Sequence, residues 1–306
     1  MTASEYSWIK KGRIFVPKGR HPKLFSHAAN PLAMPLSKDV FRIYYCGRDA
    51  KKRSSVGAFD YDMKTGRVIE DYEEPIFSTG RPGSFCESGV SIGNCYRVGT
   101  KTYMSFMAWQ VPKNAHWYGE IGRFIVNDDM TLSLDQDEPF ISCQAFNSIS
   151  LSYPWVQPAD QGGFEMWYGT TETWNAGNNE MLHVLRRAIS SDGQVWEQTD
   201  DVLPFALGSA QAFSRPAILK GQDGTQNMWF SYRSGSGTSY RIGHSRFSDG
   251  IWSQTPGRPG IDVSQTGWDS EMIEYPYVFE YQDKIFMLYN GNGYGETGIG
   301  LAELQR

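Results

Sequence analysis

The feature that most constrains this chain is a unit of about 60 residues that recurs five times. A short segment, carrying a proline in four of its five copies, opens each unit, at 30–33, 89–92, 153–156, 215–218 and 275–278. About ten residues later an aromatic-rich run follows, at 41–45, 102–106, 164–168, 227–230 and 285–289. The residue types and the length of these runs predict β-strands.

Two further runs complete the unit and indicate how it closes. A third run with small residues lies at 55–59, 121–124, 184–188, 241–245 and 298–302, and a fourth at 67–77, 132–141, 196–205 and 252–261. The last unit lacks its fourth run, but the segment 8–16 starts with Trp8 and ends in apolar residues, as the fourth runs that begin at Trp196 and Trp252 do. We therefore predict an all-β fold. It is a five-bladed β-propeller with four-stranded antiparallel blades, in which the N-terminal strand completes the blade formed by about 272–304. Residues 1–306 then form a single domain.

Composition and charge exclude several classes of partner. The 14% aromatic residues, 32 Gly and 15 Pro fit a soluble all-β domain with many turns. A formal net charge of −5 without a basic stripe argues against nucleic acid and against an anionic membrane surface as partners. The N-terminus lacks a basic segment followed by an apolar run, and no apolar stretch is long enough to span a membrane. We therefore expect a cytoplasmic protein.

The cysteines and histidines do not indicate a metal site. Cys46, Cys86, Cys95 and Cys143 match neither a zinc pattern nor a small disulfide scaffold, and we expect free thiols. The five histidines have no metal-ligand spacing. The sequence predicts no cofactor and leaves the oligomeric state open.

Propeller geometry predicts where a functional site lies. The first strand of a blade starts, and the second ends, at the same face of the ring, so these positions from all five units converge on one mouth. They are rich in carboxylates, arginines and aromatic residues, a mixture that suits a sugar, because aromatic rings stack on its apolar face while polar groups bind its hydroxyls. Arg48, Arg215 and Arg233 can in addition clamp a carboxylate or a phosphate.

Four segments carry a resemblance to a known superfamily. They are His-Ala-Ala-Asn-Pro at 27–31, Arg-Ile-Tyr-Tyr-Cys-Gly-Arg-Asp at 42–49, Trp-Asp-Ser-Glu-Met at 268–272 and Tyr-Asn-Gly-Asn-Gly-Tyr-Gly at 289–295. With the five-unit layout, they resemble the five-bladed propeller glycoside hydrolases of families 32, 43, 68 and 130. More narrowly, they look like an uncharacterised glycosidase-like group associated with surface-polysaccharide biosynthesis. The resemblance covers nearly the whole chain and implies a carbohydrate-active protein.

The chain also departs from the pattern of those hydrolases. They place an aspartate at the start of the first blade, where this chain has His27 and Asn30. The Glu-Cys acid motif of invertase-type members is reversed here, as Cys86-Glu87. The usual set of three carboxylates therefore does not map onto this sequence residue by residue.

The candidate residues come from the predicted mouth. Glu87 and Glu271 form the candidate catalytic pair, with Asp269 beside them. The candidate substrate-binding residues are His27, Asn30, Arg48, Asp49, Trp109, Tyr153, Glu172, Trp174, Arg215, Arg233, Tyr275, Asn290 and Asn292. Structural roles compete with these: an ion pair of Asp49 with Arg48, a solvated loop around Glu172 and Trp174, core positions for Tyr153 and Tyr275, and a structural His27.

Three functions are compatible with this reading. The first is a glycosidase-like enzyme acting on a glycosidic linkage in polysaccharide metabolism, with an acidic or phosphorylated sugar among the candidate substrates. The second is glycosyl transfer or phosphorolysis, with the arginines holding a phosphate or a sugar nucleotide. The third is a glycan-binding propeller without catalysis. All three imply a carbohydrate or sugar-phosphate ligand.

Overall fold

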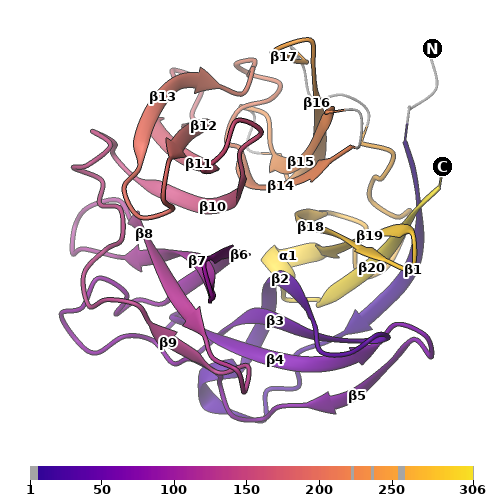
Figure 1. The fold of residues 1–306 in the computed structure, drawn as a ribbon. Helices are drawn as coiled ribbons and strands as arrows, with labels where there is room; N and C mark the ends of the chain where they lie inside the picture. Colours follow the sequence, from indigo (N-terminus) through magenta and orange to yellow (C-terminus); the bar gives the residue numbers. More distant parts are fainter. Residues whose placement is uncertain (1–5, 222–223, 236–237, 254–258, 306) are drawn as a thin grey trace.

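The computed structural model describes residues 6–221, 224–235, 238–253 and 259–305 and shows five antiparallel sheets arranged in a ring (Figure 1). Each sheet has four strands and forms one blade, so the predicted all-β, five-bladed β-propeller is confirmed. The first strand of each blade lies nearest the centre of the ring (Figure 1).

The strands follow one another outward in each blade. Blade 1 holds β2 (Ser26–Pro35), β3 (Val40–Arg48), β4 (Ser54–Asp62) and β5 (Arg67–Asp71), and blade 2 holds β6 (Val90–Val98), β7 (Lys101–Gln110), β8 (Tyr118–Val126) and β9 (Leu132–Leu134). Blade 3 holds β10 (Leu151–Pro158), β11 (Phe164–Thr173), β12 (Leu182–Ser190) and β13 (Glu197–Val202), and blade 4 holds β14 (Ser214–Lys220), β15 (Gln226–Tyr232), β16 (Arg241–Ser248) and β17 (Ile251–Trp252). Blade 5 holds β18 (Glu274–Tyr281), β19 (Lys284–Asn290), β20 (Ile299–Gln305) and the N-terminal strand β1 (Ser7–Phe15). Two short helical turns are also present, η1 (Pro22–Leu24) and α1 (Asn292–Gly295).

The N-terminal strand closes the ring as predicted. Strand β1 pairs antiparallel with β20, with Trp8 opposite Leu304. This pairing covers the edge of blade 5 with a strand from the other end of the chain. The fourth strands of the other blades are shorter than the runs in the sequence, and residues 254–258 of the predicted run 252–261 lie outside the described residues.

The recurring proline marks a β-bulge on the innermost strand. Asn30, Tyr153, Arg215 and Tyr275 each precede a proline and have φ angles of 53°, 40°, 46° and 52°. Proline has no N–H to donate, and the register of each of these strands shifts at this point. In blade 2 the register shift falls between Ile92 and Cys95. It therefore comes just after the segment 89–92, which the sequence pattern matches with the proline segments of the other blades.

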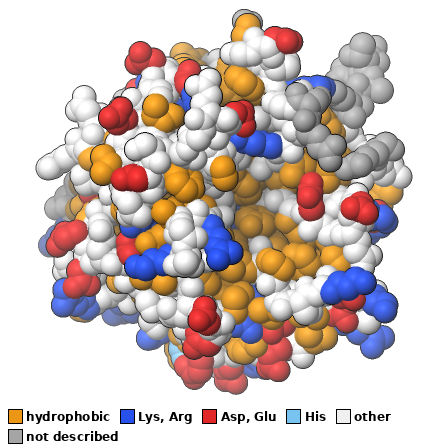
Figure 2. All heavy atoms as spheres, in the orientation of Figure 1, with side chains coloured by type: hydrophobic (Ala, Val, Ile, Leu, Met, Phe, Trp, Pro, Cys, Tyr) orange, Lys and Arg blue, Asp and Glu red, His pale blue; other side chains and the backbone are white. Residues whose placement is uncertain are grey.

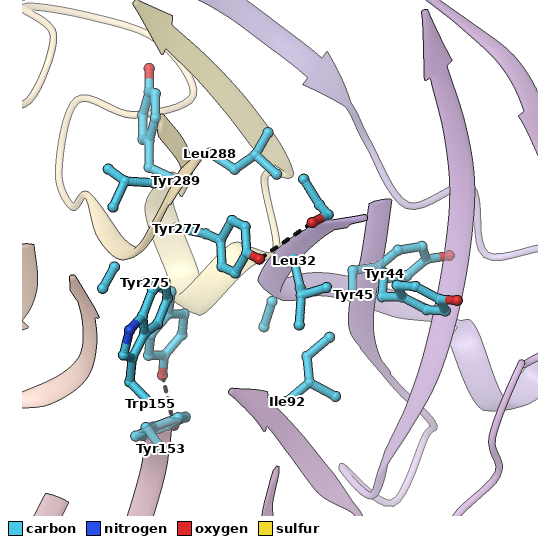
Figure 3. Close-up of a cluster of buried hydrophobic side chains, with 14 of the residues drawn as sticks. Leu32, Tyr44, Tyr45, Ile92, Tyr153, Trp155, Tyr275, Tyr277, Leu288 and Tyr289 are labelled. Carbon is cyan, nitrogen blue, oxygen red and sulfur yellow. Dashed lines mark hydrogen bonds between the residues drawn. The ribbon is translucent and has the colours of Figure 1, made fainter. Parts of the chain in front are cut away.

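A buried arginine spans the centre of the ring. Arg215 comes from β14 in blade 4, is 2% exposed, and donates to the carbonyl oxygens of Pro31 in blade 1 and Ile92 in blade 2, both at 2.6 Å. Aromatic side chains of blades 3 and 5 meet beside the axis, where the hydroxyl groups of Tyr153 and Tyr275 are 3.3 Å apart (Figure 3). The innermost strands are therefore joined across the axis by polar contacts as well as by packing.

The remaining features of the fold are the cysteines and the two helical turns. All four cysteines are free thiols. Within the described ranges, neither helical turn is long or apolar enough to cross a membrane.

Candidate functional site

A pocket of about 420 Å³ receives residues from all five blades. We call it the five-blade pocket. Its lining comes from the starts of first strands, the ends of second strands and the loops that follow them, as propeller geometry predicts for a mouth. The lining residues are Arg48, Trp109, His116, Trp117, Ser152, Tyr153, Trp174, Asn179, Glu180, Met181, His183, Phe213, Ser214, Arg233, Tyr240, Tyr275 and Tyr294.

Six of the candidates chosen from the sequence line this pocket. They are Arg48, Trp109, Tyr153, Trp174, Arg233 and Tyr275. In the view of Figure 2, hydrophobic side chains collect around the centre of the ring and Lys and Arg side chains border them.

The three candidate catalytic carboxylates are not in the lining of the five-blade pocket. Glu87 is half-buried and accepts a hydrogen bond from the backbone N–H of Gly83 at 2.6 Å. Asp269 is 2% exposed, forms an ion pair with Lys10 at 2.7 Å and accepts from the hydroxyl of Tyr289. Glu271 is exposed. Glu87 and Glu271 therefore do not line this pocket, and their role as a catalytic pair stays a prediction.

Three polar candidates have other local partners. Asp49 does not pair with Arg48: it binds Arg53 at 2.8 Å and caps the backbone N–H of the turn after β3. Glu172 binds Arg186 at 2.9 Å beside a different depression. His27 is outside the pocket lining, but its Nε2 lies 3.3 Å from Nη1 of Arg48. His27 is thus a neighbour of a pocket arginine.

The side chains of two asparagines, Asn290 and Asn292, brace the backbone. The amide of Asn290 accepts from the N–H of Asn30 at 3.0 Å and donates to two carbonyl oxygens, including that of Ala28 at 2.7 Å. The side-chain oxygen of Asn292 accepts from two successive N–H groups of the loop before β18. These amides hold loops at the axis, as Arg215 holds the backbone carbonyls of Pro31 and Ile92. The side chain of Asn30 is itself buried.

The structure adds a carboxyl group that the sequence reading passed over. Glu274, the first residue of β18, is fully buried, and neither of its carboxyl oxygens has a hydrogen-bond partner among the described residues. Burial raises the pKa of Glu274 well above its usual range, while the positive charges of Arg48 and Arg233 act in the opposite direction. Both arginines and the next residue, Tyr275, line the five-blade pocket, whereas Glu274 itself does not.

Glu274 stands out when the five repeats are compared at equivalent positions of their innermost strands. It stands immediately before the bulge residue of blade 5, where the other blades have Ala29, Ile92, Ser152 and Ser214. A carboxyl group at a position that is otherwise small or apolar is unusual, because burying it without a partner is costly. In the four segments that carry the proline this position stands two residues before it, so the sequence already contains the contrast.

An aromatic wall forms one side of the pocket. The ring of Trp174 stacks on that of His116 with centroids 4.7 Å apart and an interplanar angle of 18°. Trp117 lies between Trp174 and Trp109, with ring centroids 5.0 and 4.8 Å away. Half-exposed aromatic faces grouped in this way offer the apolar platform that a sugar ring needs.

A buried histidine supports the wall near Tyr153. The Nε2 of His183 lies 2.6 Å from the hydroxyl of Ser152, and its Nδ1 lies 2.8 Å from the hydroxyl of Thr171. Burial lowers the pKa of His183 to about 3, so the ring is neutral at physiological pH. A Cβ on Gly169 would lie 2.1 Å from the Ser152 hydroxyl, so only glycine leaves room for this contact. The serine is fully buried, which fits a structural role better than that of a nucleophile.

The charges of the pocket are unevenly balanced. Arg233 is neutralised by Glu180, with N···O distances of 2.7 and 2.9 Å. Arg48 has no carboxylate within ion-pair distance in the part of the chain that the structure describes. Its recorded side-chain contact is with His27.

Two further observations bear on the choice of site. A larger groove of about 840 Å³ lies between blades 3 and 4, but its buried carboxylate, Glu165, is already bound by Arg187 and Gln157. The described residues contain no cluster of three or more metal-ligating side chains. The five-blade pocket therefore combines a wall of aromatic rings with an arginine that has no carboxylate partner among the described residues, and Glu274, next to the lining residue Tyr275, is a buried carboxyl group without a hydrogen-bond partner among them.

Comparisons with known proteins give the family. The chain is 40% identical over 302 residues to the uncharacterized proteins Rv1502 and MT1551 of two Mycobacterium tuberculosis strains, covering 98% of this chain and 99% of each relative. The chain belongs to the family of these two proteins. No family model matches it.

Solved structures share the fold at low sequence identity. The RGII complex of BT0996 superposes with a TM-score of 0.76 at 13% identity, over 99% of this chain and 92% of that protein. A glycoside hydrolase gives 0.74 at 12% identity with the same coverage, and a structure from the GH130 family of mannoside phosphorylases and hydrolases gives 0.68 at 11% identity over 99% and 94%. The predicted likeness to five-bladed propeller glycoside hydrolases is confirmed at the level of the fold.

Proposed function

We propose that this protein is a glycosidase-like enzyme that binds a sugar in the five-blade pocket and acts on its glycosidic linkage. The observation that carries the proposal is the buried carboxyl group of Glu274 beside a pocket walled by Trp109, Trp117 and Trp174. Aromatic rings of this kind bind sugars by stacking on their C–H faces.

Glu274 has the property that a general acid needs. A carboxyl group in an apolar site keeps its proton at neutral pH and can transfer it to the oxygen of a leaving group. Burial raises the pKa of Glu274 in this sense. Glu180 provides a second carboxylate on the pocket wall, and two carboxyl groups around one linkage are the usual equipment for glycoside hydrolysis. In this proposal the catalytic pair moves from Glu87 and Glu271 to Glu274 and Glu180.

The same geometry keeps two alternatives in view. Arg48, without a carboxylate partner among the described residues, suits a phosphate and hence phosphorolysis or transfer from a sugar nucleotide. The ion pair of Glu180 with Arg233 and the complete burial of Glu274 suit a glycan-binding propeller that performs no chemistry.

One set of assays separates the three functions. We expect the wild-type protein to release nitrophenol from at least one member of a panel of nitrophenyl glycosides. Glu274→Gln should lower kcat at least about 100-fold, the scale of general acid catalysis, with KM changed less. Glu280→Gln, an exposed position on the same strand, is the matched control.

The outcomes are distinct. Turnover that requires added inorganic phosphate favours phosphorolysis. Sugar binding by calorimetry without turnover of any glycoside favours the binding protein and contradicts the enzyme. The other expectations from the sequence stay predictions: a cytoplasmic location, a role in surface-polysaccharide biosynthesis, a single domain over 1–306, and the absence of nucleic-acid and membrane partners.

A further inference from the structure

The positive charge of Arg48 is the starting point. Its guanidinium lines the five-blade pocket at the end of β3, and within the described ranges no carboxylate lies within ion-pair distance of it. The neighbouring Asp49 is turned away and held by Arg53 at 2.8 Å. A half-buried guanidinium without a counter-ion is costly unless a ligand supplies the negative charge.

The side chain within hydrogen-bond distance of this guanidinium, His27, does not cancel its charge. The Nε2 of His27 lies 3.3 Å from Nη1 of Arg48, while Nδ1 lies 2.9 Å from the hydroxyl of Ser26. Burial and the charges of Arg48 and Lys52 lower the pKa of His27 to about 4, so its ring is neutral at physiological pH. The imidazole can therefore orient the guanidinium and leave its charge in place.

The two other charged side chains of the lining, Arg233 and Glu180, balance one another. Arg233 and Glu180 form a close ion pair on the opposite wall and sum to zero. The buried carboxyl of Glu274 is favoured in its neutral form. Among the described residues that line the pocket, Arg48 is therefore the charged side chain left without an ion pair.

We propose that Arg48 holds an anionic group, a carboxylate or a phosphate, of the sugar that binds in the five-blade pocket. This proposal rests on the proposed function in one respect, that the pocket is the sugar site. It deepens that function by naming the substrate class: an acidic sugar or a sugar phosphate, with the ring against the wall of Trp174 and Trp117 and the anionic group at the end of β3.

The chemistry favours an anion over a neutral hydroxyl. A guanidinium presents two parallel N–H groups that match two oxygens of a carboxylate or phosphate. In a half-buried site the attraction is less screened than on an open surface. A hydrogen bond between two charged groups is stronger than one to a neutral hydroxyl, so an anionic sugar should bind at least about tenfold more tightly than its neutral parent.

The test uses matched ligands and calorimetry. The ligands are glucose, mannose and galactose, each as the neutral sugar, the uronate and the 6-phosphate, together with inorganic phosphate and acetate. For at least one sugar we expect the anionic form to bind at least about tenfold more tightly than the neutral one. Preference for the uronate or for the 6-phosphate identifies which anion the site takes.

Substitution of Arg48 locates the effect. Arg48→Gln should remove the gain of the anionic ligand and leave the affinity for the neutral parent within about twofold, and Arg48→Lys should restore part of the gain. Arg186→Gln, which removes an arginine outside the pocket lining, is the control for charge alone. Circular dichroism checks that each variant is folded.

The possible failures are distinguishable. Neutral and anionic sugars binding equally well, or Arg48→Gln weakening both alike, overturns this inference and leaves the proposed function standing. Binding of phosphate or acetate that depends on Arg48, with no sugar bound, contradicts the proposed function and supports the anion site. Binding of none of the ligands overturns both.

Discussion

Replacing Glu274 by glutamine should make the stability of the protein less sensitive to high pH. In the unfolded chain this carboxyl titrates near its ordinary pKa of about 4.3, whereas burial raises its pKa in the folded protein. Above pH ~4.3 the unfolded state therefore binds fewer protons than the folded state. The stabilisation is complete at low pH and is lost as the pH rises toward the folded pKa.

The size of the effect follows from proton linkage. Each pH unit between the two pKa values lowers the free energy of unfolding by about 1.4 kcal/mol. Glutamine has no proton to lose, so the difference in unfolding free energy between Glu274→Gln and the wild type should grow by about 1.4 kcal/mol with each pH unit until the pH reaches the folded pKa. At pH ~4 the variant should be no more stable than the wild type, because its amide leaves polar atoms without partners in a buried position.

Urea denaturation at a series of pH values between 4 and 8 measures this difference. Glu280→Gln, on the same strand but exposed, should show no comparable dependence on pH. A difference for Glu274→Gln that stays constant across the series would refute the reasoning. It would mean that the carboxyl group of Glu274 titrates as it does in water, so that water or a charged partner reaches it.

Three further changes test other parts of the structure. Gly93→Ala should destabilise the protein by about 1–3 kcal/mol in urea denaturation, because a Cβ there would lie 2.1 Å from the carbonyl oxygen of Pro154. Gly99→Ala controls for the added side-chain volume, because nothing lies within 4 Å of a Cβ at that position. It does not control for backbone conformation, since Gly99 has a positive φ of 59°. Arg215→Met should cost about 3 kcal/mol or more by the same assay, since it leaves the carbonyls at the axis without donors; equal stability of the variant would contradict the bridging role. Trp174→Ala should weaken sugar binding measured by calorimetry by about tenfold with little change in unfolding free energy, and unchanged binding would place the sugar elsewhere.

The fold could be predicted from the sequence because the information for it is local and repeated. An aromatic-rich run followed by a run with small residues recurs five times, and a displaced run beginning at Trp8 pairs with the last unit. Even the bulges have a local cause, since a proline in an inner strand breaks the ladder wherever it stands. These features depend on the backbone and on residue type, which a sequence records directly.

The site was predicted only in part, for a physical reason. Sequence register indicates which residues approach the mouth, and on that basis Arg48, Arg233 and Trp174 were chosen and line the pocket. Register does not reveal which partner a side chain takes. Asp49 turns to Arg53, Asp269 turns to Lys10, and the hydrogen-bonding groups of Arg215 are used by backbone carbonyls.

The burial of Glu274 is the part of the site that the sequence does not reveal. Glu274 stands one residue before a bulge, and in the sequence it is one carboxylate among many. Its neutral form is favoured because the assembled ring buries it fully, which outweighs the opposing charges of Arg48 and Arg233. The sequence by itself determined the ring, its closing strand and the face where a site forms. The tertiary structure decided which charges on that face are paired, which are buried, and that Arg48 has no carboxylate partner among the described residues, since desolvation and pairing arise only when distant segments pack together.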